Sequence, residues 1–128
     1  MKVASWPVAG LGFLVLVAVS GIASAAQPYE GFWASTPREC RNQDSASRLS
    51  IEGGGRFNWY ETRCRADEVR ADGDRAWRMR LSCEGEGEKF KSRPRVSIAA
   101  DGKLVMDNGP VGRAKRQTYV RCDASKKR

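Results

Sequence analysis

The sequence predicts an all-β protein: a small antiparallel β-barrel or sandwich of about 7–8 strands, with one short helical turn and disulfide staples. Three observations support this fold class. Apolar residues alternate with polar ones over short segments, and glycine-containing turns separate these segments. Beyond residue 26, no segment sustains a helical period over three turns. Four cysteines lie in a chain of only 128 residues, a length that suits one domain.

The first residues have the pattern of an export signal. Lys2 provides a positive charge, residues 8–22 are an apolar run, and Ala23-Ser24-Ala25 has the small residues that signal peptidases require. We therefore expect a signal peptide at residues 1–25 and a single exported β domain at residues 26–128, with cleavage one residue later as an alternative. An uncleaved anchor is a weaker alternative, because an apolar run of about 15 residues is shorter than the roughly 20 that span a bilayer. The mature chain is then exported, to the periplasm or the medium, and does not span the membrane.

The mature chain begins with a strand and a helical turn. Residues 31–34 are strand-like, with aromatic side chains after a glycine. Thr36-Pro37-Arg38-Glu39 has a hydroxyl, a proline and a glutamate at the spacing of a helix N-terminus. We therefore expect one helical turn that carries Cys40.

Two short hairpins follow from matched period-two segments. A loop of three glycines pairs Ile51 with Phe57, and a turn at Asp101-Gly102 pairs Ile98 with Leu104. Each hairpin aligns two apolar faces, which is typical of a half-buried sheet. The same hairpins pair Leu49 with Trp59 and Val96 with Met106, and the last strand is expected at residues 117–122.

The four cysteines, Cys40, Cys64, Cys83 and Cys122, predict two disulfides. An even number of cysteines in a small exported domain is typical of a disulfide framework. A structural metal site would need pairs of closely spaced ligands, which the sequence lacks, and free thiols are the remaining alternative.

A turn signal favours one of the three pairings. A two-residue loop at Gly73-Asp74 places Cys64 opposite Cys83, and Cys40 is then left to pair with Cys122. A register shifted by one residue would match Val69 with Met79 better and would need a bulge near Cys64, so the register stays open. The second strand of this hairpin has a period-two apolar face: Trp77, Met79, Leu81 and Cys83.

Gly31-Phe32-Trp33 resembles the GxW motif of lipocalin-like (calycin) barrels. In that superfamily the tryptophan packs at the closed end of the barrel, beneath an arginine from near the last strand. The resemblance therefore implies structural roles for Gly31 and Trp33, with Arg121 as the arginine partner.

A longer pattern is similar to small exported bacterial domains of unknown function. Their order is a GxW motif, a cysteine, a WYExxC-like strand, a CxGEG element and a closing YxRC. This chain has the five elements at residues 31–33, 40, 59–64, 83–87 and 119–122. Those domains bring no characterised activity, so the resemblance implies only fold and compartment.

Catalytic chemistry has few candidates, because the sequence contains no histidine. This excludes Ser-His-Asp triads, Cys-His dyads and histidine-ligated metal sites. Glu61 shares strand parity with expected core residues, so partial burial would perturb its pKa; an ion pair with Arg63 or Arg65 is the interpretation we favour. A carboxylate-based hydrolase would draw on Glu61, Glu68, Glu84 and Glu86.

Glu84, Glu86 and Glu88 alternate with glycine and could bind a divalent cation through their carboxylates. An acidic, glycine-rich loop is more often a solvated turn, and this one lacks the Asp/Asn ladder of a calcium loop. We therefore expect no catalytic residues, no metal and no cofactor.

Positive charge is the strongest functional indication. The chain carries 23 Lys+Arg against 15 Asp+Glu, a net charge of +8, or +7 without Lys2. Basic patches attract phosphates, acidic glycans and anionic lipid surfaces, whereas a solvated basic face that only aids solubility is the alternative. Nucleic acid is disfavoured by export. The expected anion-binding rim consists of Arg93, Arg95, Arg113, Lys115 and Arg116, and residues 126–128 form a basic tail.

Three functions compete. The export signal, the disulfides, the barrel pattern and the lack of catalytic groups favour a small exported binding or accessory protein, with an anionic envelope component as its partner class. The first alternative is a binder of anionic glycan or lipid surfaces through the basic rim. The second, which the residues favour least, is a small carboxylate-based hydrolase.

Overall fold

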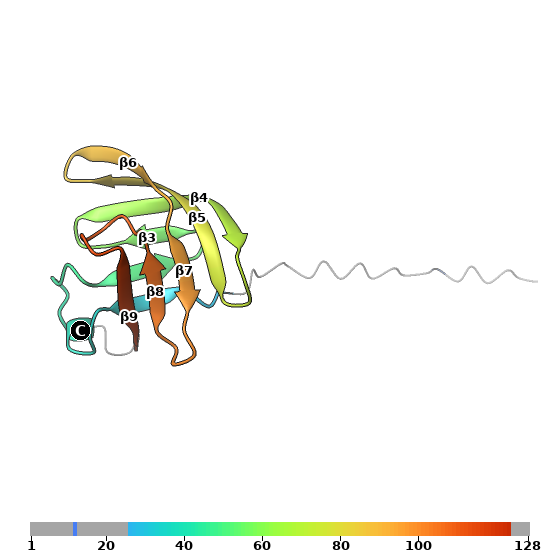
Figure 1. Cartoon of the computed structure of the whole chain (residues 1–128), viewed down its shortest axis with the longest axis horizontal. Helices are drawn as coiled ribbons and strands as arrows, with labels where there is room; N and C mark the ends of the chain where they lie inside the picture. The colour runs from blue at the N-terminus through green and yellow to red at the C-terminus, as the bar shows by residue number, and fades with distance from the viewer. Residues whose placement is uncertain (1–11, 13–25, 124–128) are drawn as a thin grey trace, which may run out of the picture.

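The computed structural model of the chain describes Gly12 and residues 26–123 (Figure 1). The expected signal peptide, apart from Gly12, and the basic tail at residues 126–128 lie outside the described residues. Within the described part, no helix is long and apolar enough to cross a membrane. These residues form one sheet of nine strands and a short turn of 3-10 helix.

Eight strands close into an antiparallel barrel, so the all-β fold class is confirmed and the barrel is selected over the sandwich. The strand order is β4-β3-β2-β1-β9-β8-β7-β5, and β4 pairs with β5 to close the ring. β6 pairs only with β5, outside the ring, and the sequence did not predict it. The elements are β1 (Gly31–Ala34), η1 (Glu39–Arg41), β2 (Leu49–Glu52), β3 (Arg56–Asn58), β4 (Thr62–Ala71), β5 (Ala76–Gly85), β6 (Glu88–Ser92), β7 (Arg95–Ile98), β8 (Leu104–Asp107) and β9 (Arg116–Cys122).

β5 is long enough to serve two neighbours along one edge. Residues 76–78 pair with β7, and residues 81–85 pair with β6. The chain passes from β6 to β7 through Arg93 and the buried Pro94, whose carbonyl accepts a hydrogen bond from the Met79 N–H (3.0 Å). Because proline has no N–H to donate, the ladder is interrupted there. β6 can therefore leave the barrel wall while β7 stays in it.

The β4–β5 hairpin contains both of the registers that the sequence left open. Cys64 lies opposite Cys83, whereas Val69 lies opposite Met79, and the register shifts between them at Asp67. Asp67 is the extra residue of a β-bulge, close to the position that the sequence required for the shifted register. The bulge restores the cysteine pairing after the turn has displaced the strands by one residue.

The turn of this hairpin corrects one expectation. The Asp72 N–H donates to the carbonyl of Ala76 (2.8 Å), so the loop contains residues 73–75 rather than two residues. Gly73 adopts a φ of +122°, a conformation that suits glycine and permits the longer turn. The other two hairpins have the expected pairs, Ile51 with Phe57 and Ile98 with Leu104.

Both expected disulfides are present. Cys64 and Cys83 join β4 to β5, and Cys40 and Cys122 join η1 to the end of β9 across a sequence separation of 82. The expected helical turn carries Cys40, and the Thr36 hydroxyl accepts a hydrogen bond from the N–H at its first residue, Glu39 (3.2 Å).

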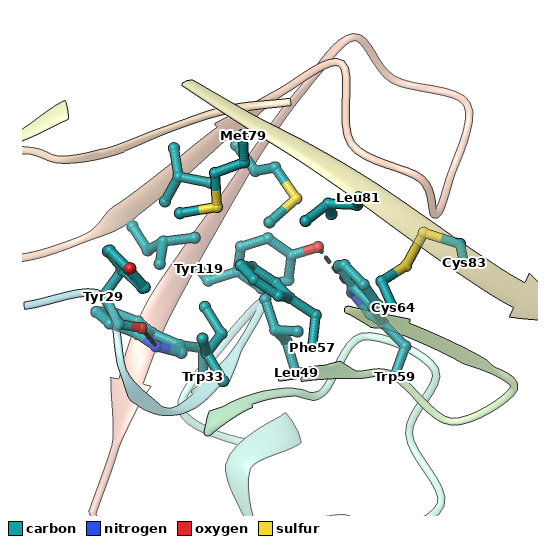
Figure 2. Packing of buried hydrophobic residues seen from close by; sticks show 14 of the residues in the cluster. Tyr29, Trp33, Leu49, Phe57, Trp59, Cys64, Met79, Leu81, Cys83 and Tyr119 are labelled. Carbon is teal, nitrogen blue, oxygen red and sulfur yellow. Dashed lines mark hydrogen bonds between the residues drawn. A yellow bond between two sulfur atoms is a disulfide. The ribbon is translucent and has the colours of Figure 1, made fainter. Parts of the chain in front are cut away.

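The barrel interior is filled by apolar side chains (Figure 2). The buried Trp59 indole N–H donates to the Tyr119 hydroxyl (3.4 Å), which in turn donates to the side-chain oxygen of Gln117 (2.7 Å). Burial raises the pKa of Tyr119. A barrel of eight strands is just wide enough for side chains to fill it, so this interior is a packed core. The largest fully buried side chains are Trp33, Phe57, Leu49, Ile51, Leu81, Leu104, Met106, Val96 and Pro94.

Gly31, Trp33 and Arg121 form one unit where β1 pairs with β9. The Arg121 guanidinium lies 4.1 Å from the centre of the fully buried Trp33 ring, a cation–π contact. It also donates to the carbonyls of Glu30 (3.0 Å) and Pro28 (2.7 Å). Gly31 has a φ of +133°, and a Cβ there would come within 2.7 Å of an Arg121 nitrogen. The glycine of the GxW motif therefore leaves room for the arginine.

Candidate functional site

The outer face of β3, β4, β5 and β6 forms an open groove of about 730 Å³. Antiparallel register aligns outward-facing residues of these strands in rows, because side chains two apart on a strand share a face. Arg56 lies opposite Arg65 and Arg65 opposite Ser82, while Arg63 lies opposite Glu84. Five cations line the groove, together with the carboxylates of Glu52 and Glu84: Arg56, Arg63, Arg65, Lys89 and Lys91. We call this surface the basic groove.

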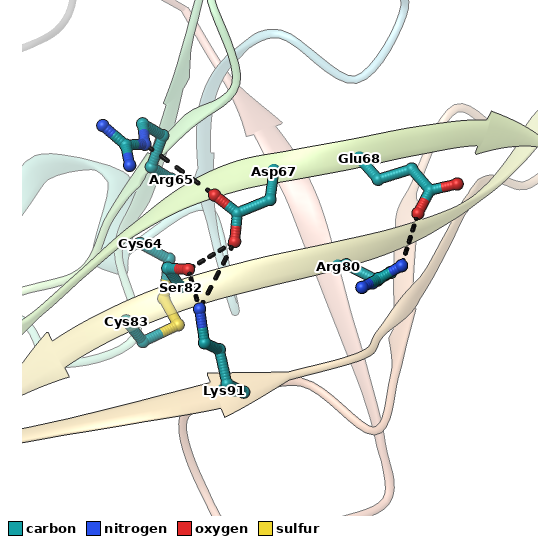
Figure 3. A network of polar contacts seen from close by, with 8 residues as sticks. All are labelled: Cys64, Arg65, Asp67, Glu68, Arg80, Ser82, Cys83 and Lys91. Atoms are coloured by element: carbon teal, nitrogen blue, oxygen red, sulfur yellow. Dashed lines mark hydrogen bonds and ion pairs between the residues drawn. A yellow bond between two sulfur atoms is a disulfide. The ribbon is translucent and has the colours of Figure 1, made fainter.

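Asp67 is held at the edge of the basic groove by the β-bulge (Figure 3). Its carboxylate lies 3.7 Å from the Lys91 ammonium and 4.0 Å from the Arg65 guanidinium, and it accepts a hydrogen bond from the Ser82 hydroxyl. The Ser82 hydrogen bond is the main reason why the pKa of Asp67 lies below its usual value, and Lys91 and Arg65 add to the effect. One carboxylate thus serves two of the five cations.

The remaining cations differ in how far the protein neutralises them. Arg63 forms an exposed ion pair with Glu84 (3.3 Å). Within the described part of the chain, neither Arg56 nor Lys89 forms an ion pair or a side-chain hydrogen bond. Exposed ion pairs contribute little stability, so even the paired groove cations keep donors for another anion. The groove can therefore bind carboxylate, phosphate or sulfate groups through several guanidinium and ammonium donors.

The expected basic rim is divided by acidic residues. Arg95 on β7 donates to the Asp72 carboxylate (2.9 Å), which also accepts from Arg78 (3.0 Å). Arg116 on β9 donates to both oxygens of Asp107 (2.7 and 3.3 Å). Asp107 stands between Arg95 and Arg116 in the register, so the two arginines do not form a continuous cationic surface.

The other rim residues lie on connections rather than on the sheet. Arg93 is in the β6–β7 connection and lines a different hollow, whereas Arg113 and Lys115 are in the loop between β8 and β9. All three are exposed, and none forms an ion pair among residues 26–123. Anion binding at this rim stays a prediction.

The candidate catalytic carboxylates are exposed or already engaged. Glu61 lies in the β3–β4 loop and is exposed, so its expected burial is wrong; the chain leaves the strand after Asn58 and the strand parity ends there. The favoured arginine pair is also absent for Glu61 among the described residues, because Arg63 pairs with Glu84 instead. Glu68 contacts Arg80 (2.9 Å) and Arg70.

The glycine-rich acidic segment forms the β5–β6 turn. Glu86 has a positive φ of 52° in this turn, and Glu88 begins β6. Across the part of the chain that the structure describes, no group of three or more acidic or cysteine side chains is arranged to hold a metal ion.

The sequence interpretation missed the basic groove, although a signal was present. Arg63 and Arg65 alternate around Cys64, and Lys89 and Lys91 alternate around Phe90. The expected β4–β5 pairing already placed the two arginines on the face opposite the disulfide. The missing step was β6, which brings both lysines beside them.

Comparison with known proteins gave no relatives: no protein-family model, no curated protein and no solved structure matches this chain.

Proposed function

We propose that this protein is a small exported binding or accessory protein that takes an anionic ligand in the basic groove. The carrying observation is the alignment of five cations on one hollowed face, with Arg56 and Lys89 lacking protein partners among the described residues. The two disulfides suit an oxidising compartment, such as the periplasm or the medium. The absence of histidine from the sequence disfavours the commonest acid–base chemistry.

The filled interior favours ligand binding on the outside of the barrel. The contact between Trp33 and Arg121 supports a relationship with lipocalin-like barrels. That relationship is limited to the way in which the barrel is closed. Lipocalins hold small ligands inside their barrels, whereas aromatic and aliphatic side chains occupy the interior here.

The shape of the site favours a narrow anionic chain over a flat lipid surface. The cations line an open hollow between rows of side chains, so a chain of carboxylate, sulfate or phosphate groups can reach several of them at once. A bilayer surface would need cations that project from one plane. The expected basic rim remains the competing location, because three of its cations are exposed and unpaired among residues 26–123.

Salt-dependent retention on a heparin column tests the proposal with two charge-matched variants. The groove variant is Arg56→Gln, Arg63→Gln and Arg65→Gln; the rim variant is Arg113→Gln, Lys115→Gln and Arg116→Gln. Both remove three positive charges, so net charge alone predicts equal losses of retention. We expect the groove variant to elute at much lower salt than wild type and the rim variant to elute near wild type.

The opposite order would move the site to the rim and contradict the groove proposal. Equal, small losses in both variants would indicate dispersed charge and a solvated face. Thermal unfolding of both variants is the folding control, because replacement of an exposed cation should change stability by no more than about 0.5 kcal/mol for each position.

A further inference from the structure

β6 is an edge strand with an unused side. It pairs with β5 along one edge, and within the described residues no backbone hydrogen bond reaches its other edge. Figure 1 shows β6 at the outer margin of the sheet, past the end of the barrel wall. Unpaired edge strands present N–H and C=O groups that can pair with an added strand.

The hydrogen-bonding direction of β6 follows from that of β5. The Met79 N–H points to the β6–β7 side of β5, since it donates to the Pro94 carbonyl. The direction of the backbone N–H and C=O groups alternates from one residue to the next along a strand. The backbone groups of Cys83 therefore also point to β6, where they exchange hydrogen bonds with those of its partner Phe90. The N–H and C=O groups of Lys89 and Lys91 must then face the free edge.

The side chains of β6 divide between two environments. Lys89 and Lys91 point to the basic groove, where they line the same hollow as the arginines of β3 and β4. Phe90 projects to the other face and is partly buried against the core. On that face Phe90 lines a second hollow of about 290 Å³, together with Pro110 and Val111.

We propose that the anionic ligand is an extended acidic peptide segment of a partner protein, which adds as a strand to the free edge of β6. This inference rests on the proposed anion-binding function and names its partner class. The segment has an acidic, an apolar and an acidic residue opposite Lys89, Phe90 and Lys91. Its acidic side chains enter the basic groove, and its apolar side chain packs beside Phe90.

Charge selects this occupant over a second copy of the chain. Two β6 strands that pair in antiparallel fashion about Phe90 would place Lys89 of one copy opposite Lys91 of the other. Like charges directly opposite each other destabilise a strand pair, and edge lysines protect natural sheets from self-association in this way. Acidic side chains at the same positions form favourable pairs.

The other free edge of the sheet is less suited to strand addition. The part of β4 beyond its contact with β3 also lacks a second neighbour, but it begins at the Asp67 bulge. A bulge twists an edge and interrupts its regular pattern of donors and acceptors. Glu68 and Arg70 also neutralise each other there.

The test uses a short, end-blocked peptide that alternates glutamate and valine and carries fluorescein. Its binding to the full mature protein is measured by fluorescence anisotropy at low and moderate salt. A second peptide of the same sequence is N-methylated at the amides that would face β6, so its charge is unchanged. Strand addition predicts that the parent peptide binds and that the N-methylated peptide binds at least about tenfold more weakly.

Two variants of one position separate backbone pairing from charge. Lys89→Ala removes the charge and keeps the edge N–H, so binding should weaken by up to about fivefold. Lys89→Pro also removes the outward N–H while the β5–β6 ladder keeps its bonds, so binding should weaken by up to a further tenfold or so. Thermal unfolding checks that both variants fold, and the N-methylated peptide with wild-type protein needs no variant.

The outcomes distinguish this inference from the function on which it rests. Equal binding of the parent and N-methylated peptides would overturn strand addition, even if the groove binds anions. Binding of a heparin oligosaccharide without any binding of the peptide would leave the groove function intact and contradict the peptide partner. A dimer in sedimentation that Lys89→Pro dissociates would show that a second copy occupies the edge, against the proposal. Peptide binding that is lost with Lys89→Pro but unchanged in the Arg56, Arg63 and Arg65 variant would support strand addition and contradict the groove function.

Discussion

The β1–β9 junction and the basic groove both expose arginines on the barrel surface, but they use them differently. At the junction, Arg121 lies over the Trp33 ring and donates to two backbone carbonyls. In the basic groove, Arg56 has neither an ion pair nor a side-chain hydrogen bond among the described residues. Arg121 is therefore committed to the fold, whereas Arg56 remains available to a ligand.

The comparison shows why position and partners matter more than net charge. The rim cations Arg95 and Arg116 resemble Arg121 in one respect, since their donors are already bound within the protein, although to the carboxylates of Asp72 and Asp107 rather than to carbonyls. A sequence can show that a chain is basic. It does not show which cations the fold has already satisfied.

Removal of the disulfides should give the largest difference in stability between the two regions. Cys40–Cys122 ties the junction across 82 residues, whereas Cys64–Cys83 lies beside the groove and spans 19. In the chain-entropy model, loops of these lengths contribute about 4.5 and about 3 kcal/mol. Replacement of both cysteines of each pair by alanine should therefore lower the free energy of unfolding more at the junction, as measured by urea denaturation. A larger loss from the Cys64 and Cys83 replacement would reverse the comparison.

The next largest difference is expected between alanine variants of Arg121 and Arg56. Arg121→Ala removes a cation–π contact and two hydrogen bonds, so we expect a loss of about 1–2 kcal/mol in thermal unfolding, with heparin retention largely kept. Arg56→Ala, the matched control, should leave the unfolding temperature unchanged and lower retention.

Gly31→Ala is a companion test of the junction. A Cβ at Gly31 would collide with the Arg121 guanidinium, and the backbone of Gly31 has a φ of +133°, which an alanine rarely adopts. This variant should therefore also be destabilised. In the Arg121→Ala background the collision is gone and only the backbone cost remains, so the same substitution should cost less. Additive losses in the double variant would show that the two residues do not act as a unit.

The sequence predicted most of the fold because the strongest signals were local. Turn residues and period-two faces predicted the hairpins of Ile51 with Phe57 and Ile98 with Leu104. The predicted pairing of Cys64 with Cys83 is also present, although the loop length behind it was wrong and the bulge compensates for the longer turn. The sequence left two registers open for the β4–β5 hairpin, and only one of them included a bulge. Turn length and bulge position compensate for each other, so the sequence alone does not determine either of them.

The proposed binding surface was harder to predict because it depends on pairings between residues that are distant in sequence. The rim was expected where basic residues are dense in sequence, around residues 113–116. The groove instead brings residue 56 beside residues 63–65 and residues 89–91, and the last group lies on a strand that the sequence did not predict. The pairing of Arg95 with Asp72 spans 23 residues and was equally invisible.

Acid should lower the stability of β4 and β5 more than that of the β1–β9 junction. This is the smallest effect that we predict. Hydrogen bonds from Ser82, Arg70 and Arg95 hold the pKa values of Asp67, Glu68 and Asp72, respectively, below their usual values. A lowered folded-state pKa gives stability that is present above the unfolded-state pKa of about 4 and is lost as pH falls through the folded-state pKa.

Amide hydrogen exchange should therefore show β4 and β5 loosening below about pH 4, before the β1–β9 junction, where Arg121 contacts carbonyls that do not titrate. Between about pH 5 and 7 stability should be nearly constant, because the chain has no histidine. Earlier loosening of β1 and β9 in acid would contradict this assignment.

The central claim, that the basic groove is the anion-binding surface, is tested most directly by mapping a bound polyanion with NMR. A heparin oligosaccharide is titrated into isotopically labelled mature protein at low salt, and backbone amide shifts are followed for every strand. We expect the largest changes at residues 56, 63–65 and 89–91, and nearly unchanged amides at Trp33 and Arg121. Shifts that concentrate at residues 113–116, or that spread evenly over all exposed lysines and arginines, would contradict the claim.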